Sequence, residues 1–293
     1  MRLNNFNLYA ATVLIWGSTW LTIKFQLGVV PPSVSVVWRF MLSALMLLAY
    51  AGWKGLPLRL GWREHPWLAL EGVSMFGVNY LAVYLSEQYL TSGLIAVVFS
   101  LIAFFNFVLM RMFYGTPIRI SDAMGALVGI TGVALVFWPE VVRFSASANE
   151  LMGLGYALAA TILASFGNIV ATRNHRAGMA VTLVNGWAML YGAVSVTVCA
   201  LLRGDRFVFD WSAPYVASLI YLSLFGSVLA FGAYVTLIGR IGTGRAGYTS
   251  IAIPIVALLL STLFEGLQWQ FVMVIGIALC LLGNLLVLSR DKA

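Results

Sequence analysis

The chain has 293 residues, of which 61% are apolar and 9% are charged, and its mean hydropathy is +0.95. A soluble domain is typically about 45–50% apolar and about 25% charged. This composition excludes a water-soluble monomer and leaves no polar stretch long enough for a separate soluble domain. The formal net charge of +7 is not gathered into a basic run with interleaved aromatic residues, so we expect no nucleic-acid partner. The expected surroundings are the lipid bilayer.

Ten apolar runs follow one another along the chain, and each is long enough to cross a bilayer as a helix of about 20 residues. Their continuous apolarity differs from the alternating pattern of membrane β-strands. The sequence therefore predicts an all-α membrane protein with ten transmembrane helices. The predicted spans are residues 6–26, 33–51, 68–87, 92–112, 121–138, 151–172, 179–201, 212–237, 246–265 and 269–289.

The basic residues predict the orientation of these spans. Most of the 17 Lys and Arg residues fall in alternate connections, beginning with Arg2 and ending with Arg290 and Lys292. Basic residues concentrate in cytoplasmic loops, so both termini are expected in the cytoplasm. The first run lacks a small-residue cleavage signature and is interpreted as a retained span. We expect a multi-pass protein of a bacterial-type cytoplasmic (inner) membrane.

Features of the first five spans recur in the last five at nearly constant spacing. The matched features are Tyr9 with Tyr156, Ser18 with Ser165, Phe76-Gly77 with Phe225-Gly226, and Gly125 and Gly132 with Gly276 and Gly283. This pattern predicts two five-helix domains, residues 1–143 and 144–293. Because five is odd, the second domain enters the membrane inverted. Inverted repeats build transporters with a substrate site near the membrane midplane, between the halves.

At this level of detail the chain resembles, over essentially its whole length, the drug/metabolite transporter superfamily with paired EamA-type domains. The resemblance is carried by Trp16-Gly17-Ser18-Thr19-Trp20, by Arg39-Phe40, and by Pro254-Ile255-Val256-Ala257-Leu258-Leu259-Leu260 with Glu265 after it. Within the superfamily, the finer likeness is to the aromatic amino-acid exporter branch. The resemblance implies export of small metabolites by alternating access.

The fourth and ninth spans differ in one element of the superfamily pattern. Ser100 and Arg111 stand in the fourth span where a proline and a glutamate are expected. We therefore expect a break or kink at Pro254 in the ninth span and none in the fourth. Pro254 is the candidate hinge, because a proline frees a backbone carbonyl within a helix.

Polar and aromatic residues inside the spans are the candidate substrate-binding residues, because lipid-facing positions do not satisfy polar groups. In the first span three of them share one helix face at i, i+3 and i+4. The full set is Trp16, Thr19, Trp20, Asn79, Tyr80, Tyr84, Ser100, Ser165, Asn168, Ser227, Tyr234 and Ser250. One interpretation is a pocket in which aromatic faces stack on a substrate side chain while Asn and Ser bond its carboxylate and ammonium groups. The other is simple packing between helices or at the membrane interface.

Arg39 is a cation within the second span, which is costly unless it is paired or reaches the interface. Glu87, near the outer end of the third span, is its expected partner, and Lys24 competes for the same carboxylate. The pair is interpreted either as a structural ion pair that holds the outer side shut or as an outer gate.

The acidic residues avoid the middle of the spans. Glu71, Glu87 and Glu265 lie near span ends, and His65 and His175 lie in loops. Proton antiport normally needs a titratable group on the pathway. The sequence therefore predicts an uncoupled exporter of amino acids, favouring aromatic and other neutral ones. The alternatives are an exporter of cationic or aromatic drugs or metabolites and a proton-coupled antiporter of the same superfamily.

No enzyme motif is found among the spans: there is no HExxH pair, no pair of mid-span aspartates and no Ser with a His in reach. We expect no catalytic residue, no metal and no cofactor, and no disulfide between Cys199 and Cys280. The paired glycines in the fifth and tenth spans predict a close helix contact, either between these spans or between protomers. Both a monomer and a homodimer are compatible with the sequence.

Overall fold

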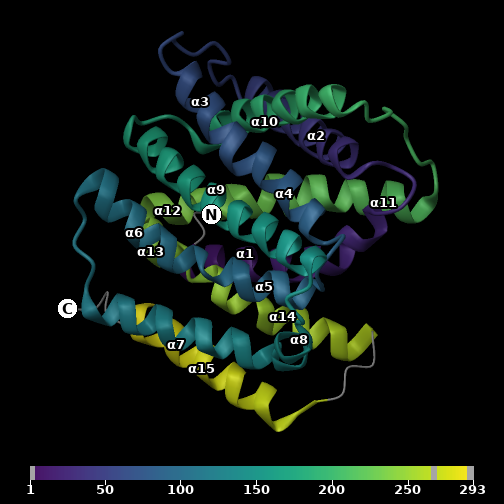
Figure 1. Ribbon diagram of the computed structural model, residues 1–293. Coiled ribbons are helices and arrows are strands. Elements are labelled where there is room, and N and C mark those ends of the chain that lie inside the picture. The colour runs from purple at the N-terminus through teal and green to yellow at the C-terminus, as the bar shows by residue number, and fades with distance from the viewer. Residues whose placement is uncertain (1–3, 265–268, 289–293) are drawn as a thin grey trace.

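The computed structural model describes residues 4–264 and 269–288, and these residues form helices and connections without a strand. The first half contains α1 (Asn5–Ile23), η1 (Lys24–Gln26), α2 (Pro32–Trp53), α3 (His65–Glu71), η2 (Gly72–Gly77), α4 (Val78–Ser86), α5 (Ser92–Ser100), α6 (Ile102–Tyr114), α7 (Ile120–Val136) and α8 (Trp138–Arg143). The second half contains α9 (Ala148–Arg176), α10 (Val181–Arg203), α11 (Ala213–Tyr221), η3 (Leu222–Leu229), α12 (Ala230–Ile241), α13 (Thr243–Ala246), α14 (Thr249–Phe264) and α15 (Phe271–Leu288). The long helices pack side by side as a bundle (Figure 1). The predicted all-helical class is confirmed.

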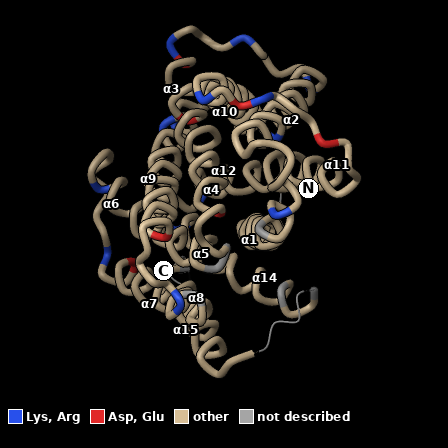
Figure 2. Tube along the Cα trace, turned by 45° about the vertical axis from the view of Figure 1, so that its right-hand side comes forward, with Lys and Arg blue, Asp and Glu red and all other residues tan. Residues whose placement is uncertain are grey.

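The helices of the bundle have the length and apolarity of membrane-spanning segments. Seven helical segments are long and apolar enough to cross one: 32–53, 65–86, 94–114, 148–176, 181–203, 213–241 and 243–260. Two shorter apolar helices, Ile120–Val136 and Phe271–Val287, accompany them. Most charged positions lie on connections and at helix ends, and the helix bodies are largely uncharged (Figure 2). The chain is an integral multi-pass membrane protein, and the exact count of ten spans stays a prediction.

Two of the spans contain a stretch of π-helix. η2 interrupts the helix that runs from α3 into α4, and η3 interrupts the helix that runs from α11 into α12. The Phe76-Gly77 and Phe225-Gly226 pairs, which match in the sequence comparison of the two halves, lie in these two segments. Single π turns inside α-helices are frequently found at functional sites. The matched motifs thus mark matched irregularities of the backbone.

Helices α7 and α15 pack closely through their glycines. A Cβ atom on Gly132 would lie 2.7 Å from the Gly276 carbonyl oxygen. One on Gly283 would lie 2.7 Å from the Gly125 carbonyl oxygen. The two helices are therefore antiparallel and touch backbone to backbone, which only residues without a side chain permit. Of the two contacts that the sequence left open, the structure shows the one between the fifth and tenth spans.

The expectation of an unbroken fourth span is wrong. The fourth span divides at Leu101, where α5 ends and α6 begins. Directly before this division the Ser100 Oγ donates to the Val97 carbonyl oxygen at 2.6 Å. In the ninth span α14 runs through Pro254 without interruption. Pro254 stands only one turn after the first residues of α14, where few helical bonds precede it. Its role as a hinge stays a prediction.

Candidate functional site

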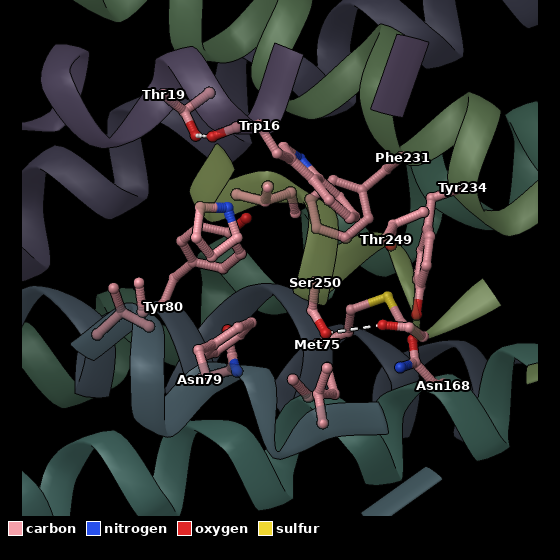
Figure 3. A pocket seen from close by; sticks show the side chains of 18 of the residues that line it. Trp16, Thr19, Met75, Asn79, Tyr80, Asn168, Phe231, Tyr234, Thr249 and Ser250 are labelled. Atoms are coloured by element: carbon pink, nitrogen blue, oxygen red, sulfur yellow. Dashed lines mark hydrogen bonds between the residues drawn. The ribbon is translucent and has the colours of Figure 1, made fainter. Parts of the chain in front are cut away.

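A cavity of about 90 Å³ lies inside the bundle, where α1, α4, α5, α9, α12 and α14 meet (Figure 3). This volume holds several water molecules. The cavity is lined by Trp16, Thr19, Ile23, Met75, Asn79, Tyr80, Val83, Ala96, Phe99, Ile102, Ala164, Asn168, Phe231, Tyr234, Gly247, Thr249, Ser250, Ile253 and Pro254. Both halves of the chain contribute to it.

One side of the cavity is aromatic. The Trp16 ring centroid lies 4.8 Å from that of Phe231 and 5.0 Å from that of Tyr234, with tilted or edge-on geometry. Trp16 Nε1 donates to the Gly226 carbonyl oxygen at 3.0 Å, so the indole is held by the η3 segment. Tyr80 approaches Phe231 at 6.3 Å between centroids. Aromatic rings in this range attract one another and leave edges and faces for a further ring.

The polar groups of the cavity have a common bonding pattern. The hydroxyls of Thr19, Thr249 and Ser250 donate to the carbonyl oxygens of Trp16, Ala246 and Gly247 at 2.7–2.9 Å. Since each hydroxyl hydrogen is used in this way, the oxygen remains an acceptor. The Thr249 and Ser250 oxygens, which line the cavity beside the aromatic rings, suit a donor group such as an ammonium.

Hydrogen bonds of an asparagine outside the cavity hold one residue of its wall in place. Asn168 Nδ2 donates to Asn106 Oδ1 at 3.1 Å, and Asn106 Nδ2 donates to the Thr243 carbonyl oxygen at 3.2 Å. Both asparagines are buried. These bonds tie α9 to α6 and α13 and fix the orientation of the Asn168 amide in the cavity wall.

Eight of the predicted site residues lie in the cavity wall: Trp16, Thr19, Asn79, Tyr80, Asn168, Tyr234, Ser250 and Pro254. Four lie outside it: Tyr84, Ser100, Ser165 and Ser227. Tyr84 is fully buried one turn beyond Tyr80, and the Ser100 hydroxyl is bonded within its own helix. The side chain of Trp20 and the residue Glu265 lie outside the described part of the chain.

Several lining residues were not predicted, among them Met75, Phe99, Phe231 and Thr249. Two of them carried a usable signal in the sequence. Phe231 stands three residues before Tyr234 and shares its helix face, and Thr249 is the neighbour of Ser250. The supporting Asn106 gave a weaker signal, since a single amide in an apolar run does not show what it faces.

Arg39 is 1% exposed and does not form the expected ion pair with Glu87. Its Nε donates to Ser227 Oγ at 3.0 Å, and its Cζ lies 4.7 Å from the Tyr80 ring centroid. The difference arises because α2 packs against η3, so that Ser227 of the π segment accepts the hydrogen bond from Arg39. Among the described residues, the cation whose charge acts on Glu87 is Lys24.

No Asp, Glu or His side chain lines the cavity. The buried acid Glu71, four residues before the lining residue Met75, belongs to a polar cluster outside the cavity. Asn174 Nδ2 donates to Glu71 Oε2 at 2.6 Å, and Arg173 contacts both the Asn174 amide and the Glu64 carboxylate. Glu71 Oε1 has no hydrogen-bond partner among the described residues.

Known proteins align with nearly the whole chain. The uncharacterised inner membrane transporter YedA of Escherichia coli is 27% identical over 96% of this chain and 92% of its own. A probable amino-acid metabolite efflux pump of Escherichia coli is 25% identical over 88% of this chain and 87% of its own. A solved crystal structure superposes with a TM-score of 0.80 over 98% of each chain at 18% identity, which shows a shared fold.

The family match covers both halves of the chain. Residues 7–138 and residues 151–289 each match the EamA-like transporter family, one match within each predicted domain. The predicted resemblance is confirmed at this level, and the aromatic amino-acid exporter branch stays a prediction. The chain belongs to the EamA-like transporter family.

Proposed function

We propose that the chain exports amino acids across the inner membrane, favouring aromatic and other neutral ones, by alternating access and without a coupling ion. The observation that carries the proposal is the cavity between the two halves, which is lined by aromatic rings together with hydroxyl and amide groups. The name of the Escherichia coli efflux relative supports it. An amino acid with a ring presents the two complementary surfaces.

The proposal includes ten spans in two inverted repeats, with both termini in the cytoplasm. The seven long segments, the two shorter apolar helices and α1 account for ten. The antiparallel contact of α7 with α15 supports inversion, because spans five apart run in opposite directions only if the second repeat is inverted. Alternation of access then moves one repeat against the other around a fixed site.

The experiment is counterflow with purified protein in liposomes. Labelled phenylalanine is added outside vesicles loaded with phenylalanine, tryptophan, threonine or a quaternary amine. We expect labelled phenylalanine to accumulate in vesicles loaded with phenylalanine or tryptophan, and to accumulate only weakly in vesicles loaded with threonine. If labelled phenylalanine accumulated only in vesicles loaded with the quaternary amine, the substrates would be cationic compounds and not amino acids.

A second candidate, a proton-coupled antiporter, is favoured by one observation. Glu71 is fully buried within the segment 65–86 and one of its carboxylate oxygens has no partner among the described residues. A buried carboxyl in a membrane span is a candidate proton carrier. Glu71 does not contribute to the cavity wall, which favours the uncoupled mechanism.

The Glu71→Gln variant separates the two mechanisms. Under the uncoupled mechanism an imposed proton gradient does not drive phenylalanine accumulation, and the variant keeps counterflow within about twofold of the wild type because the amide retains a bond to Asn174. Tracer flux is measured with and without the gradient. Gradient-driven accumulation that disappears in Glu71→Gln would establish the antiporter.

A further inference from the structure

Arg39 is a buried cation that has no anionic partner among the described residues. Its side chain is 1% exposed, and no carboxylate of the described residues forms an ion pair with it. It lies among neutral groups: the Ser227 hydroxyl at 3.0 Å, the ring faces of Tyr80 and Phe40 at 4.7 and 5.2 Å from Cζ, and the hydroxyl of Tyr84. Nη1 has no hydrogen-bond partner among the described residues. Burying a cation in this way is costly unless an anion reaches it.

The guanidinium lies directly behind the cavity wall. Tyr80, whose ring it faces, lines the cavity. A Cβ on Gly226 would lie 3.2 Å from Arg39 Nη2 and 3.0 Å from Thr19 Cγ2. Because residue 226 is a glycine, only this small gap separates the cation from Thr19, which also lines the cavity. The positive charge thus stands at the end of the cavity formed by Thr19 and Tyr80.

The nearby acid does not cancel this charge. Glu87 lies beyond Tyr84, whose hydroxyl is close to both Arg39 and Glu87. Lys24 acts on the same Glu87 carboxylate, so among the described residues around Tyr84 one acid stands against two cations. The cavity wall itself holds no charged residue. Electrostatic attraction from an uncompensated cation persists in such surroundings because screening is weak.

We propose that Arg39 makes the cavity selective for substrates that carry a carboxylate, which binds at the end formed by the methyl group of Thr19 and the ring of Tyr80, facing the guanidinium. This inference rests on the proposed function and specifies its substrate class. The substrate ring then lies toward Trp16 and Phe231, and the ammonium of an amino acid lies toward the hydroxyls of Thr249 and Ser250. A purely cationic compound is disfavoured in the same place.

The test compares two probes with one carbon skeleton and opposite charge, phenylpropanoate and phenethylamine. Their binding to purified protein in detergent is measured by calorimetry for the wild type and for the Arg39→Gln and Arg39→Lys variants. Arg203→Gln is the matched control, since Arg203 lies at the end of α10 with a half-exposed side chain. Melting temperatures show which variants are folded.

We expect the wild type to bind phenylpropanoate at least about tenfold more tightly than phenethylamine. Arg39→Gln abolishes this preference, while Arg39→Lys and Arg203→Gln retain it. A wild type that prefers phenethylamine, or a folded Arg39→Gln variant that keeps the preference for phenylpropanoate, would overturn the inference. If Arg39→Gln does not fold, the comparison of phenylpropanoate with phenethylamine binding to the wild type still tests the inference. Failure of phenylalanine counterflow with an intact anion preference would contradict the proposed function alone.

Discussion

Replacing Gly132 with leucine is expected to destabilise the protein strongly, because it forces α7 and α15 apart. The Cβ of the new side chain would stand 2.6 Å from the Cys280 backbone nitrogen and 2.7 Å from the Gly276 carbonyl oxygen. These are backbone atoms, so no rotation of a neighbouring side chain relieves the overlap. Overpacking typically costs about 1–3 kcal/mol, and here we expect at least the upper value.

The measurement is the melting temperature in detergent, which we expect to fall by roughly 6–12 °C for about 3 kcal/mol. Gly155→Leu is the matched control, because Gly155 lies in the long helix α9 with nothing within 4 Å of its Cβ position. The control should melt close to the wild type. Equal destabilisation of both variants would show that α7 and α15 do not meet through their glycines.

Replacing Trp16 with alanine is expected to have the largest effect on transport of an aromatic amino acid. The variant removes the ring that contacts Phe231 and Tyr234 and that is anchored on Gly226. Aromatic contacts contribute about 0.5–1.5 kcal/mol beyond the buried area, and the lost apolar surface adds to this. We expect the concentration of phenylalanine for half-maximal counterflow to rise about tenfold or more.

Two controls accompany this variant. Trp16→Phe keeps a ring and loses the bond to Gly226, so its counterflow should lie between those of wild type and Trp16→Ala. Trp53→Ala removes an indole that is 77% exposed at the end of α2 and should leave counterflow unchanged. Wild-type counterflow by a folded Trp16→Ala protein would move the site away from this cavity.

Much of the architecture follows from the sequence because the membrane restricts it. An apolar run of sufficient length forms a helix, since the backbone has no other way to satisfy its polar groups in lipid. The glycines at positions 125, 132, 276 and 283 predict a close contact for a similar reason, because small residues let backbones approach. The identity of the contacting helices needed the structure.

The orientation of each side chain around its helix was harder to predict. Tyr80 and Tyr84 stand one turn apart on α4, yet only Tyr80 lines the cavity. The rotation of α4 depends on its packing against α9 and on the π-helix of η2, which shifts the residues that follow it. Arg39 shows the same limit, since its charge predicted an acidic partner and the packing of α2 on η3 placed it on Ser227.

The most direct test of a substrate site in the cavity is to locate a bound substrate analogue. Crystals of the protein with para-bromophenylalanine allow the bromine to be found by its anomalous scattering. The account predicts one bromine position among Trp16, Phe231 and Tyr80, with the carboxylate toward Arg39. A bromine bound at another place in the protein, with this cavity empty, would contradict it.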